Sequence, residues 1–106
     1  IILPSDSNNI DESVWHLYPI LVDFKRIGVS RSKFMELLLK SGIQTQVHYI
    51  PVHTQPFFQK KLNTGWGDQV NAESYYQKCL SIPLFPSMQE EEVAKVTNTI
   101  KKLIGQ

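Results

Sequence analysis

The chain has 106 residues, of which 42% are hydrophobic and 20% are charged, a composition typical of one ordinary globular domain and not of a disordered or repetitive segment. Its net charge of +1 provides no basic field, so the sequence predicts neither a nucleic-acid partner nor an anionic-membrane surface. Apolar runs such as Leu37–Leu39 are far shorter than the roughly 20 residues that a membrane-spanning helix needs. We therefore expect a soluble domain.

Two features of the sequence concern its cellular setting. Cys79 is the single cysteine, so no internal disulfide can form, and no signal-peptide pattern opens the chain; both favour a reducing, cytoplasmic location. The chain starts at Ile1 instead of Met and enters an apolar segment at once. We expect it to be part of a longer polypeptide.

The first half of the chain predicts a strand, a helix and a second strand. Aromatic and β-branched residues indicate a strand from Trp15 to Phe24, and Pro19, which has no N–H, indicates an edge or a bulge. Ser30 is the expected N-cap of a helix that runs to about Lys40, and Gly42 is its expected left-handed C-terminal residue. The helix should bury one face, made by Phe34, Met35, Leu37, Leu38 and Leu39.

The middle of the chain is less regular. Alternating residues predict a second strand from Thr45 to Ile50, which Pro51 ends. Residues 52–67 have no clean period and contain several aromatic side chains, which is more typical of a functional or packed loop than of an idle one.

The last third predicts two helices around a short strand. Asn71 is the expected cap of a helix whose apolar positions are Ala72, Tyr75, Tyr76, Cys79 and Leu80. A strand follows at 81–85, and Ser87 with Glu90 predicts a capping box for the final helix. That helix should end at Gly105 and bury Val93, Val96, Ile100, Leu103 and Ile104.

These elements predict an α/β fold of the two-layer α+β kind. The expected architecture is a small, mainly antiparallel sheet of about three strands with three helices on one face.

Polar side chains that could take part in binding or catalysis concentrate within twelve residues, namely Gln44, Gln46, His48, Tyr49, His53 and Gln55. On a strand His48 and Tyr49 would point to opposite faces, but both could reach a cleft at the strand end before Pro51. The alternative is structural: His48 is a hydrogen-bonded sheet histidine and Tyr49 a half-buried aromatic.

Other chemistries have little support. His48 and His53 lack a third ligand at a recognisable spacing, so no metal site is predicted. Cys79 lies on an apolar helical stripe and is expected to be a small buried hydrophobe. Residues 65–68 contain two glycines but lack the preceding strand and the Lys-Ser/Thr pair of a phosphate-binding loop.

Four segments of the chain, in order, closely resemble the C-terminal domain of the DegT/DnrJ-type sugar-nucleotide aminotransferases: 15–20, 42–56, 72–76 and 80–86. The string TQVHYIPVHTQPFF at 45–58 is the specific part of this resemblance. Within the family the chain is most similar to enzymes that aminate a UDP-linked 4-keto-6-deoxy-N-acetylhexosamine. It departs from the family where Gly67–Asn71 replaces a usual Gly-Asp-aromatic-Pro.

The resemblance implies that residues 1–106 are the small domain of a fold-type I aminotransferase whose large domain is missing. The large domain would hold pyridoxal 5'-phosphate on a lysine, and no lysine of this chain matches that motif, so the fragment alone should be inactive. The full-length enzyme would be a homodimer that transfers an amino group, with glutamate as donor, to a nucleotide-linked 4-keto-6-deoxy sugar for surface polysaccharide or glycan biosynthesis.

The resemblance also implies a substrate-binding segment. His48 and Tyr49 would contact the sugar nucleotide, with His53 and Gln55 behind them, and no catalytic, cofactor-binding or metal-binding residue is assigned. Arg26 and Arg31 lie in no recognisable carboxylate-clamping motif.

A second hypothesis is a free-standing sugar- or nucleotide-binding or regulatory module without catalysis. The identity of the ketosugar and its nucleotide, and amination at C3 or at C4, stay open.

Overall fold

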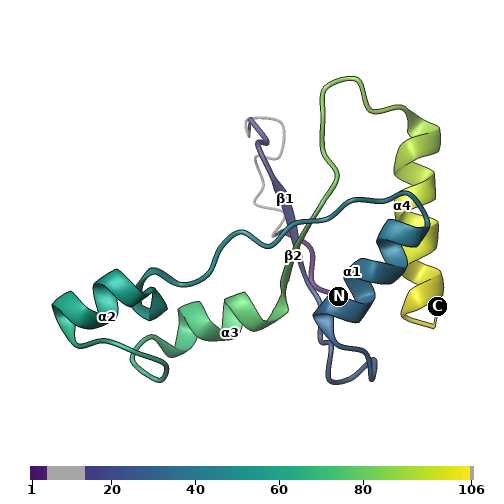
Figure 1. The fold of residues 1–106 in the computed structure, drawn as a ribbon. Helices are drawn as coiled ribbons and strands as arrows, with labels where there is room; N and C mark the ends of the chain where they lie inside the picture. The colour runs from purple at the N-terminus through teal and green to yellow at the C-terminus, as the bar shows by residue number, and fades with distance from the viewer. Residues whose placement is uncertain (5–13, 106) are drawn as a thin grey trace.

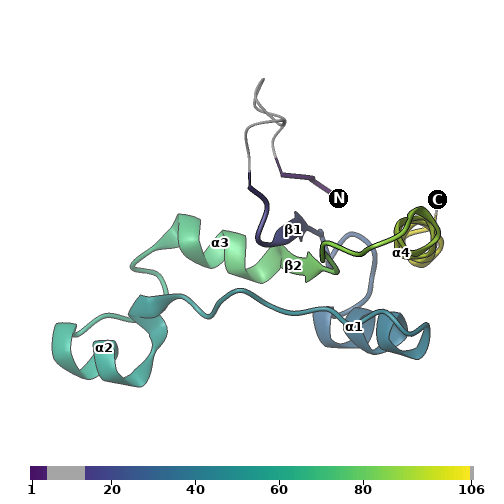
Figure 2. The same cartoon turned by 90° about the horizontal axis from the view of Figure 1, so that it is seen from above.

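Two short strands lie at the centre of the molecule, and helices extend to either side of them (Figures 1 and 2). The computed structural model describes residues 1–4 and 14–105. In chain order the elements are β1 (Tyr18–Leu21), α1 (Arg31–Lys40), the 3₁₀ turn η2 (Val52–Thr54), α2 (Pro56–Leu62), α3 (Val70–Lys78), β2 (Cys79–Ile82) and α4 (Glu90–Leu103). Both views place α1 and α4 on one side of the strands and α2 and α3 on the other.

The predicted α/β class with an antiparallel sheet is confirmed. The described part of the chain has two strands where about three were predicted, and four α-helices where three were predicted. β1 and β2 pair antiparallel, with Ile20 opposite Leu80. On the outer edge of β1 the backbone of Leu21 exchanges two hydrogen bonds with Ile2, at 2.8 and 2.9 Å. The backbone groups of Pro19, like those of Leu21, point to the edge of β1 that faces away from β2. The missing N–H of Pro19 therefore removes no bond from the β1–β2 ladder.

The predicted strand from Thr45 to Ile50 does not form; Gln46 alone pairs with β2, through two backbone hydrogen bonds to Ser81 of 3.1 and 2.8 Å. This pairing does not extend beyond Gln46 and Ser81, because the next residues of β2 and its flank that could pair on this edge are Pro83 and Cys79. Pro83 has no N–H. The N–H of Cys79 already closes α3 on the carbonyl of Tyr75.

The boundary between α3 and β2 also differs from the prediction. Cys79 and Leu80 are strand residues, because their pairing with Leu21 and Ile20 of β1 replaces a further helical turn. The strand therefore ends at Ile82 and does not cover 81–85. The N-cap of α3 is Gln69, not Asn71.

The predicted caps were accurate at α1 and less so at α4, and Leu39, predicted to lie on the buried face of α1, is 61% exposed. The Ser30 hydroxyl accepts a hydrogen bond from the backbone N–H of Lys33 at 3.2 Å, and Gly42 adopts a left-handed φ of 75°. The predicted Ser87–Glu90 capping box is wrong. The N-cap of α4 is Gln89, whose backbone N–H donates to the Glu92 carboxylate at 2.9 Å.

The core lies between the strands, α1 and α4. Its buried members are Ile20, Val22, Phe34, Leu38, Ile43, Leu80, Val96 and Ile100. Val93, predicted to be buried on the α4 stripe, is 47% exposed, because the apolar face of α4 is wider than the surface that the described residues pack against it.

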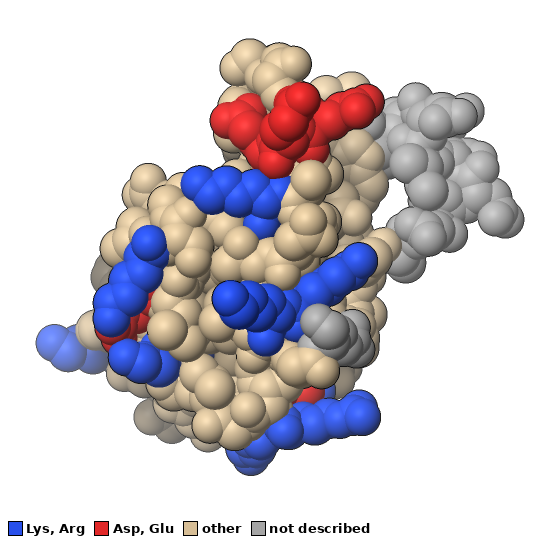
Figure 3. Space-filling view, turned by 90° about the vertical axis from the view of Figure 1, so that its right-hand side faces the viewer, with Lys and Arg blue, Asp and Glu red and all other residues tan. Residues whose placement is uncertain are grey.

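Charges on α4 follow the helix dipole. Glu90, Glu91 and Glu92 occupy the first turn, and Lys101 and Lys102 lie in the last. Figure 3 shows most of the acidic side chains gathered at one end of this face and the basic ones spread over the rest, so this face is mixed in charge. No helix in the described ranges is long and apolar enough to cross a membrane.

The side chain of Arg31 links the start of α1 to the end of α3. Its guanidinium donates to the carbonyl oxygens of Tyr76 and Cys79 and lies 4.5 Å from the centroid of the Tyr76 ring. We expect Arg31→Lys to lower the free energy of unfolding by about 1–2 kcal/mol, because lysine cannot make the planar two-carbonyl contact. Urea unfolding measures this change. Arg26→Lys, on an exposed side chain, is the matched control, and equal effects of the two variants would contradict the prediction.

Candidate functional site

A shallow pocket of about 260 Å³ lies beside β2 and contains one of the predicted site histidines. Its lining residues are Leu17, Gln44, Gln46, His48, Ser81, Ile82 and Pro83. Three of the clustered polar residues, Gln44, Gln46 and His48, therefore meet here. The pairing of Gln46 with Ser81 brings this segment against the strand.

His48 is held by a single strong contact. Its Nδ1 lies 2.8 Å from the Ser81 hydroxyl oxygen, and either atom could be the donor. Within the described residues Nε2 has no hydrogen-bond partner, and the side chain is only half-buried. One ring nitrogen thus orients the imidazole and the other is free to donate to, or accept from, a bound molecule.

Tyr49 lies against His48 and does not point away from it as a strand would require. The peptide bond between the two is cis, and their rings make an edge-to-face contact with centroids 4.6 Å apart. Tyr49 is 69% exposed, so the half-buried alternative does not hold for it. The pair presents an imidazole and a phenol side by side at the surface.

His53 lies in a different contact network, centred on Glu73. One carboxylate oxygen of Glu73, Oε1, accepts hydrogen bonds from His53 Nε2 at 2.8 Å and from the backbone N–H groups of Gly67 at 2.8 Å and Gln69 at 3.2 Å. An ionised carboxylate only accepts, which assigns the proton to Nε2 of His53. The buried Glu73 therefore joins η2, the loop before α3 and the first turn of α3.

The same contacts set the charge state of Glu73. Its hydrogen bond with His53 lowers the pKa of the carboxyl below the usual value of 4.5, burial opposes this by raising the pKa, and the amides of Gly67 and Gln69 lower it further. Glu73 is therefore ionised at neutral pH.

This lowered pKa predicts a pH-dependent contribution to stability. A carboxyl whose pKa is lower in the folded chain stabilises the fold above the unfolded value near 4.5, and this stabilisation is lost as the pH falls through the folded value. We expect the difference in unfolding free energy between the wild type and Glu73→Gln to shrink as the pH falls below the usual carboxyl value of 4.5. Urea unfolding at successive pH values checks it; a difference that grows on acidification would contradict the assignment.

Gln55, the fourth predicted site residue, is the N-cap of α2. Its backbone carbonyl accepts a hydrogen bond from the N–H of Gln59 at 2.9 Å, which begins the helix. Its side chain is half-buried. Of the four predicted residues, the structure brings His48 and Tyr49 together, and it places His53 and Gln55 on η2 and at the start of α2.

Sequence reasoning missed Glu73 and Ser81, the partners of the two histidines. The signal for Glu73 was a carboxylate four residues after Gln69, within reach of the unpaired N–H groups at a helix start. Nothing local marks Ser81, because its pairing with residue 46 is long-range.

Every lysine of the chain is exposed, and Lys33 and Lys40 are paired with Glu36, whose pKa Lys40 and Lys33 lower to about 2. No three His, Cys, Asp or Glu side chains gather in residues 1–4 and 14–105. Cys79 is buried, as predicted, and burial raises the pKa of its thiol, which opposes nucleophilic chemistry.

Fold and site together define a small α/β domain with a shallow pocket on one strand edge, into which polar and apolar residues both reach. The model of the DegT/DnrJ/EryC1/StrS aminotransferase family matches residues 1–101, and the chain belongs to this family.

Similar proteins agree with this assignment. The chain is 41% identical over 91 residues to the spore coat polysaccharide biosynthesis protein SpsC of Bacillus subtilis, a match that covers 85% of this chain and 23% of SpsC. Among solved structures, Helicobacter pylori PseC, an aminotransferase involved in the biosynthesis of pseudoaminic acid, superposes with a TM-score of 0.74 at 31% identity, over 85% of this chain and 24% of PseC.

A third similar structure is the PMP form of the putative sugar aminotransferase Spr1654 of Streptococcus pneumoniae, with a TM-score of 0.72 and 25% identity over 85% of this chain and 22% of that one. The chain spans about a quarter of the length of the curated relatives it matches.

Proposed function

We propose that this chain is the C-terminal small domain of a pyridoxal-phosphate-dependent aminotransferase that acts on a nucleotide-linked 4-keto-6-deoxy sugar. The observation that carries the proposal is the family match over residues 1–101. The names of SpsC and PseC, which concern polysaccharide and pseudoaminic acid biosynthesis, support a sugar substrate made for a surface glycan.

Three polar side chains that line the pocket beside β2 support a sugar substrate. A sugar carries several hydroxyl groups, which pair with side chains that both donate and accept, and Gln44, Gln46 and His48 are of this kind. The free Nε2 of His48 and the exposed ring of Tyr49 are the groups proposed to contact the substrate. His53 and Gln55 would position this segment from behind.

Pyridoxal phosphate would be bound by the rest of the enzyme, where it acts as the electron sink for amino transfer. The exposed lysines of this chain do not fit the attachment of that cofactor, so its part in the reaction is to bind and orient substrate. Glutamate as amino donor, a homodimer and a cytoplasmic location complete the proposal.

The direct test is an assay of the full-length protein. We expect it to consume glutamate with a UDP- or dTDP-linked 4-keto-6-deoxy sugar and to form the amino sugar, detected by mass spectrometry. A protein that binds such a sugar nucleotide but forms no amino sugar with any donor would favour the non-catalytic binding module.

The cofactor assignment gives a separate prediction. The 106-residue chain should develop no aldimine absorbance with pyridoxal phosphate, because it has no buried lysine, whereas the full-length protein should. Borohydride reduction followed by peptide mapping checks the result. Specific labelling of one lysine within residues 1–106 would overturn it.

A further inference from the structure

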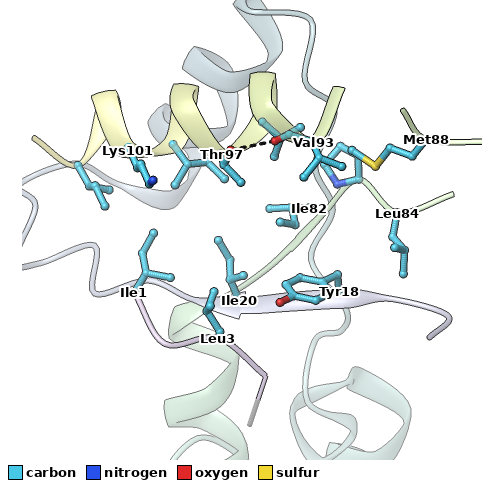
Figure 4. Close-up of a pocket in the computed structure, with 14 residues that line it drawn as sticks. Ile1, Leu3, Tyr18, Ile20, Ile82, Leu84, Met88, Val93, Thr97 and Lys101 are labelled. Atoms are coloured by element: carbon cyan, nitrogen blue, oxygen red, sulfur yellow. Dashed lines mark hydrogen bonds between the residues drawn. The ribbon is translucent and has the colours of Figure 1, made fainter. Parts of the chain in front are cut away.

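Ser81 directs its hydroxyl to the side of β2 on which His48 lies. Side chains alternate between the two faces of a strand, and the neighbouring Ile82 points instead into the apolar groove between α4 and the strands (Figure 4). Ser81 is 6% exposed, and both of its backbone groups pair with Gln46. The hydroxyl is therefore the one polar group of this buried residue that remains for another partner.

This hydroxyl has a single hydrogen-bond partner in residues 1–4 and 14–105, which is Nδ1 of His48 at 2.8 Å. If Nδ1 carried the proton of the ring, it would donate to the serine oxygen, and the buried serine proton would have no acceptor. Buried donors without an acceptor are unfavourable and rare. Ser81 therefore donates and Nδ1 accepts. Because a neutral imidazole carries one N–H, that N–H is on Nε2.

The neutral ring of His48 thus presents a hydrogen-bond donor to its surroundings. Nε2 makes no hydrogen bond to the described residues, and His48 is one of the residues that line the pocket beside β2. Gln44 and Gln46 line the same pocket with amides that both donate and accept. An N–H only donates, so it is best matched by an oxygen that only accepts, such as a carbonyl or a phosphate oxygen.

We propose that Ser81 is a positioning residue that holds His48 as the Nε2–H tautomer, and that this N–H donates a hydrogen bond to an oxygen of the substrate that only accepts. That oxygen is the keto oxygen or a phosphate oxygen, since a nucleotide-linked ketosugar carries both. The identity of the substrate rests on the proposed function. Ser81 acts through His48 and does not itself touch the substrate.

Nitrogen NMR of the full-length protein with isotope-labelled histidine reads the tautomer directly. At alkaline pH, where an ordinary imidazole is neutral, the signals of His48, identified by their loss in His48→Gln, should show a protonated Nε2 and an unprotonated Nδ1. Ser81→Ala should shift both signals toward those of a freely exchanging imidazole, and Ser87→Ala, at an exposed serine, should not. A protonated Nδ1 in the wild type, or an unchanged spectrum in Ser81→Ala, would overturn the proposal.

Two amide variants of His48 separate the role of Nε2 from that of Nδ1. Glutamine places an N–H donor near the position of Nε2, whereas the shorter asparagine replaces only the contact of Nδ1 with Ser81. His48→Gln should keep kcat/KM within about threefold of the wild-type value, and His48→Asn should lower it by about three- to a hundredfold. Equal losses, or losses in the reverse order, would contradict a donor role for Nε2.

A double-mutant cycle shows that Ser81 acts through the ring. Ser81→Ala should lower kcat/KM by about two- to tenfold in the wild-type background and should have no further effect in His48→Ala. The same loss in both backgrounds would mean that Ser81 supports the fold and does not position His48.

Calorimetric titration of the full-length protein identifies the acceptor oxygen, with uridine, UDP and a UDP-linked 4-keto-6-deoxy sugar as probes. Weaker binding of UDP but not of uridine by His48→Ala assigns a phosphate oxygen, and an effect confined to the ketosugar assigns the keto oxygen. An effect on uridine, or wild-type affinity for all three probes, would overturn the proposal.

The tautomer is measured without turnover, so its result and that of the activity assay are independent. The expected spectrum in a protein without aminotransferase activity would refute the proposed function alone. A protonated Nδ1 in an active aminotransferase would refute the role of Ser81 alone.

Discussion

Replacement of His48 by alanine in the full-length protein should lower kcat/KM for the ketosugar by about three- to a hundredfold. Loss of one polar contact costs about 0.5–1.5 kcal/mol, and up to about 3 kcal/mol where the contacted group is charged, as a diphosphate is. The physical basis is that Nε2 of His48, which has no hydrogen-bond partner in residues 1–4 and 14–105, lies beside a pocket of about 260 Å³, while the contact of Nδ1 with Ser81 holds the ring in place.

Two companion variants sharpen this test. Tyr49→Phe removes a hydroxyl from an exposed ring that touches His48 and should have a smaller effect of the same sign. His16→Ala, at an exposed histidine outside the pocket, should leave the kinetics unchanged. If His48→Ala also left kcat/KM unchanged but lowered stability, the residue would be a structural partner of Ser81.

Replacement of Phe34 by alanine should lower the free energy of unfolding by about 3–5 kcal/mol, the range for removal of a large buried aromatic side chain. Phe34 is fully buried and makes an edge contact with Phe24, with ring centroids 5.8 Å apart. The surrounding side chains come from both strands and from α4, so they cannot close the cavity without moving several elements.

The control for this variant lies on the same helix. Leu39 is 61% exposed, and Leu39→Ala should change the unfolding free energy by less than about 0.5 kcal/mol. Urea unfolding of both variants at one pH measures the difference. A loss below about 2 kcal/mol for Phe34→Ala would mean that the core around α1 is looser than the structure shows.

Sequence reasoning succeeded where the determinants of structure are local. The N-cap at Ser30 and the left-handed Gly42 fixed both ends of α1, and each depends only on residues within one helical turn. The periodic stripe of α4 correctly identified Val96 and Ile100 as core residues. The buried state of Cys79 followed from its apolar neighbours.

Sequence reasoning failed where pairing between residues far apart in the chain decides the secondary structure. Cys79 and Leu80 fit a helical stripe as well as they fit a strand, and only the presence of β1 selects the strand. Residues 45–50 alternate as a strand would, yet the neighbouring Pro83 and the occupied N–H of Cys79 limit them to one pair. For the candidate site, the segment from His48 to Gln55 was located from the sequence, but its partners on α3 and β2 were not.

The absence of a loop between α3 and β2 ties the two histidine networks together. Lys78 ends the helix and Cys79 begins the strand, so Glu73 and Ser81 lie on two elements that follow each other directly. His53 contacts Glu73 in α3, and His48 contacts Ser81 in β2. The segment from His48 to His53 is therefore held at both ends by neighbouring parts of one continuous stretch of chain.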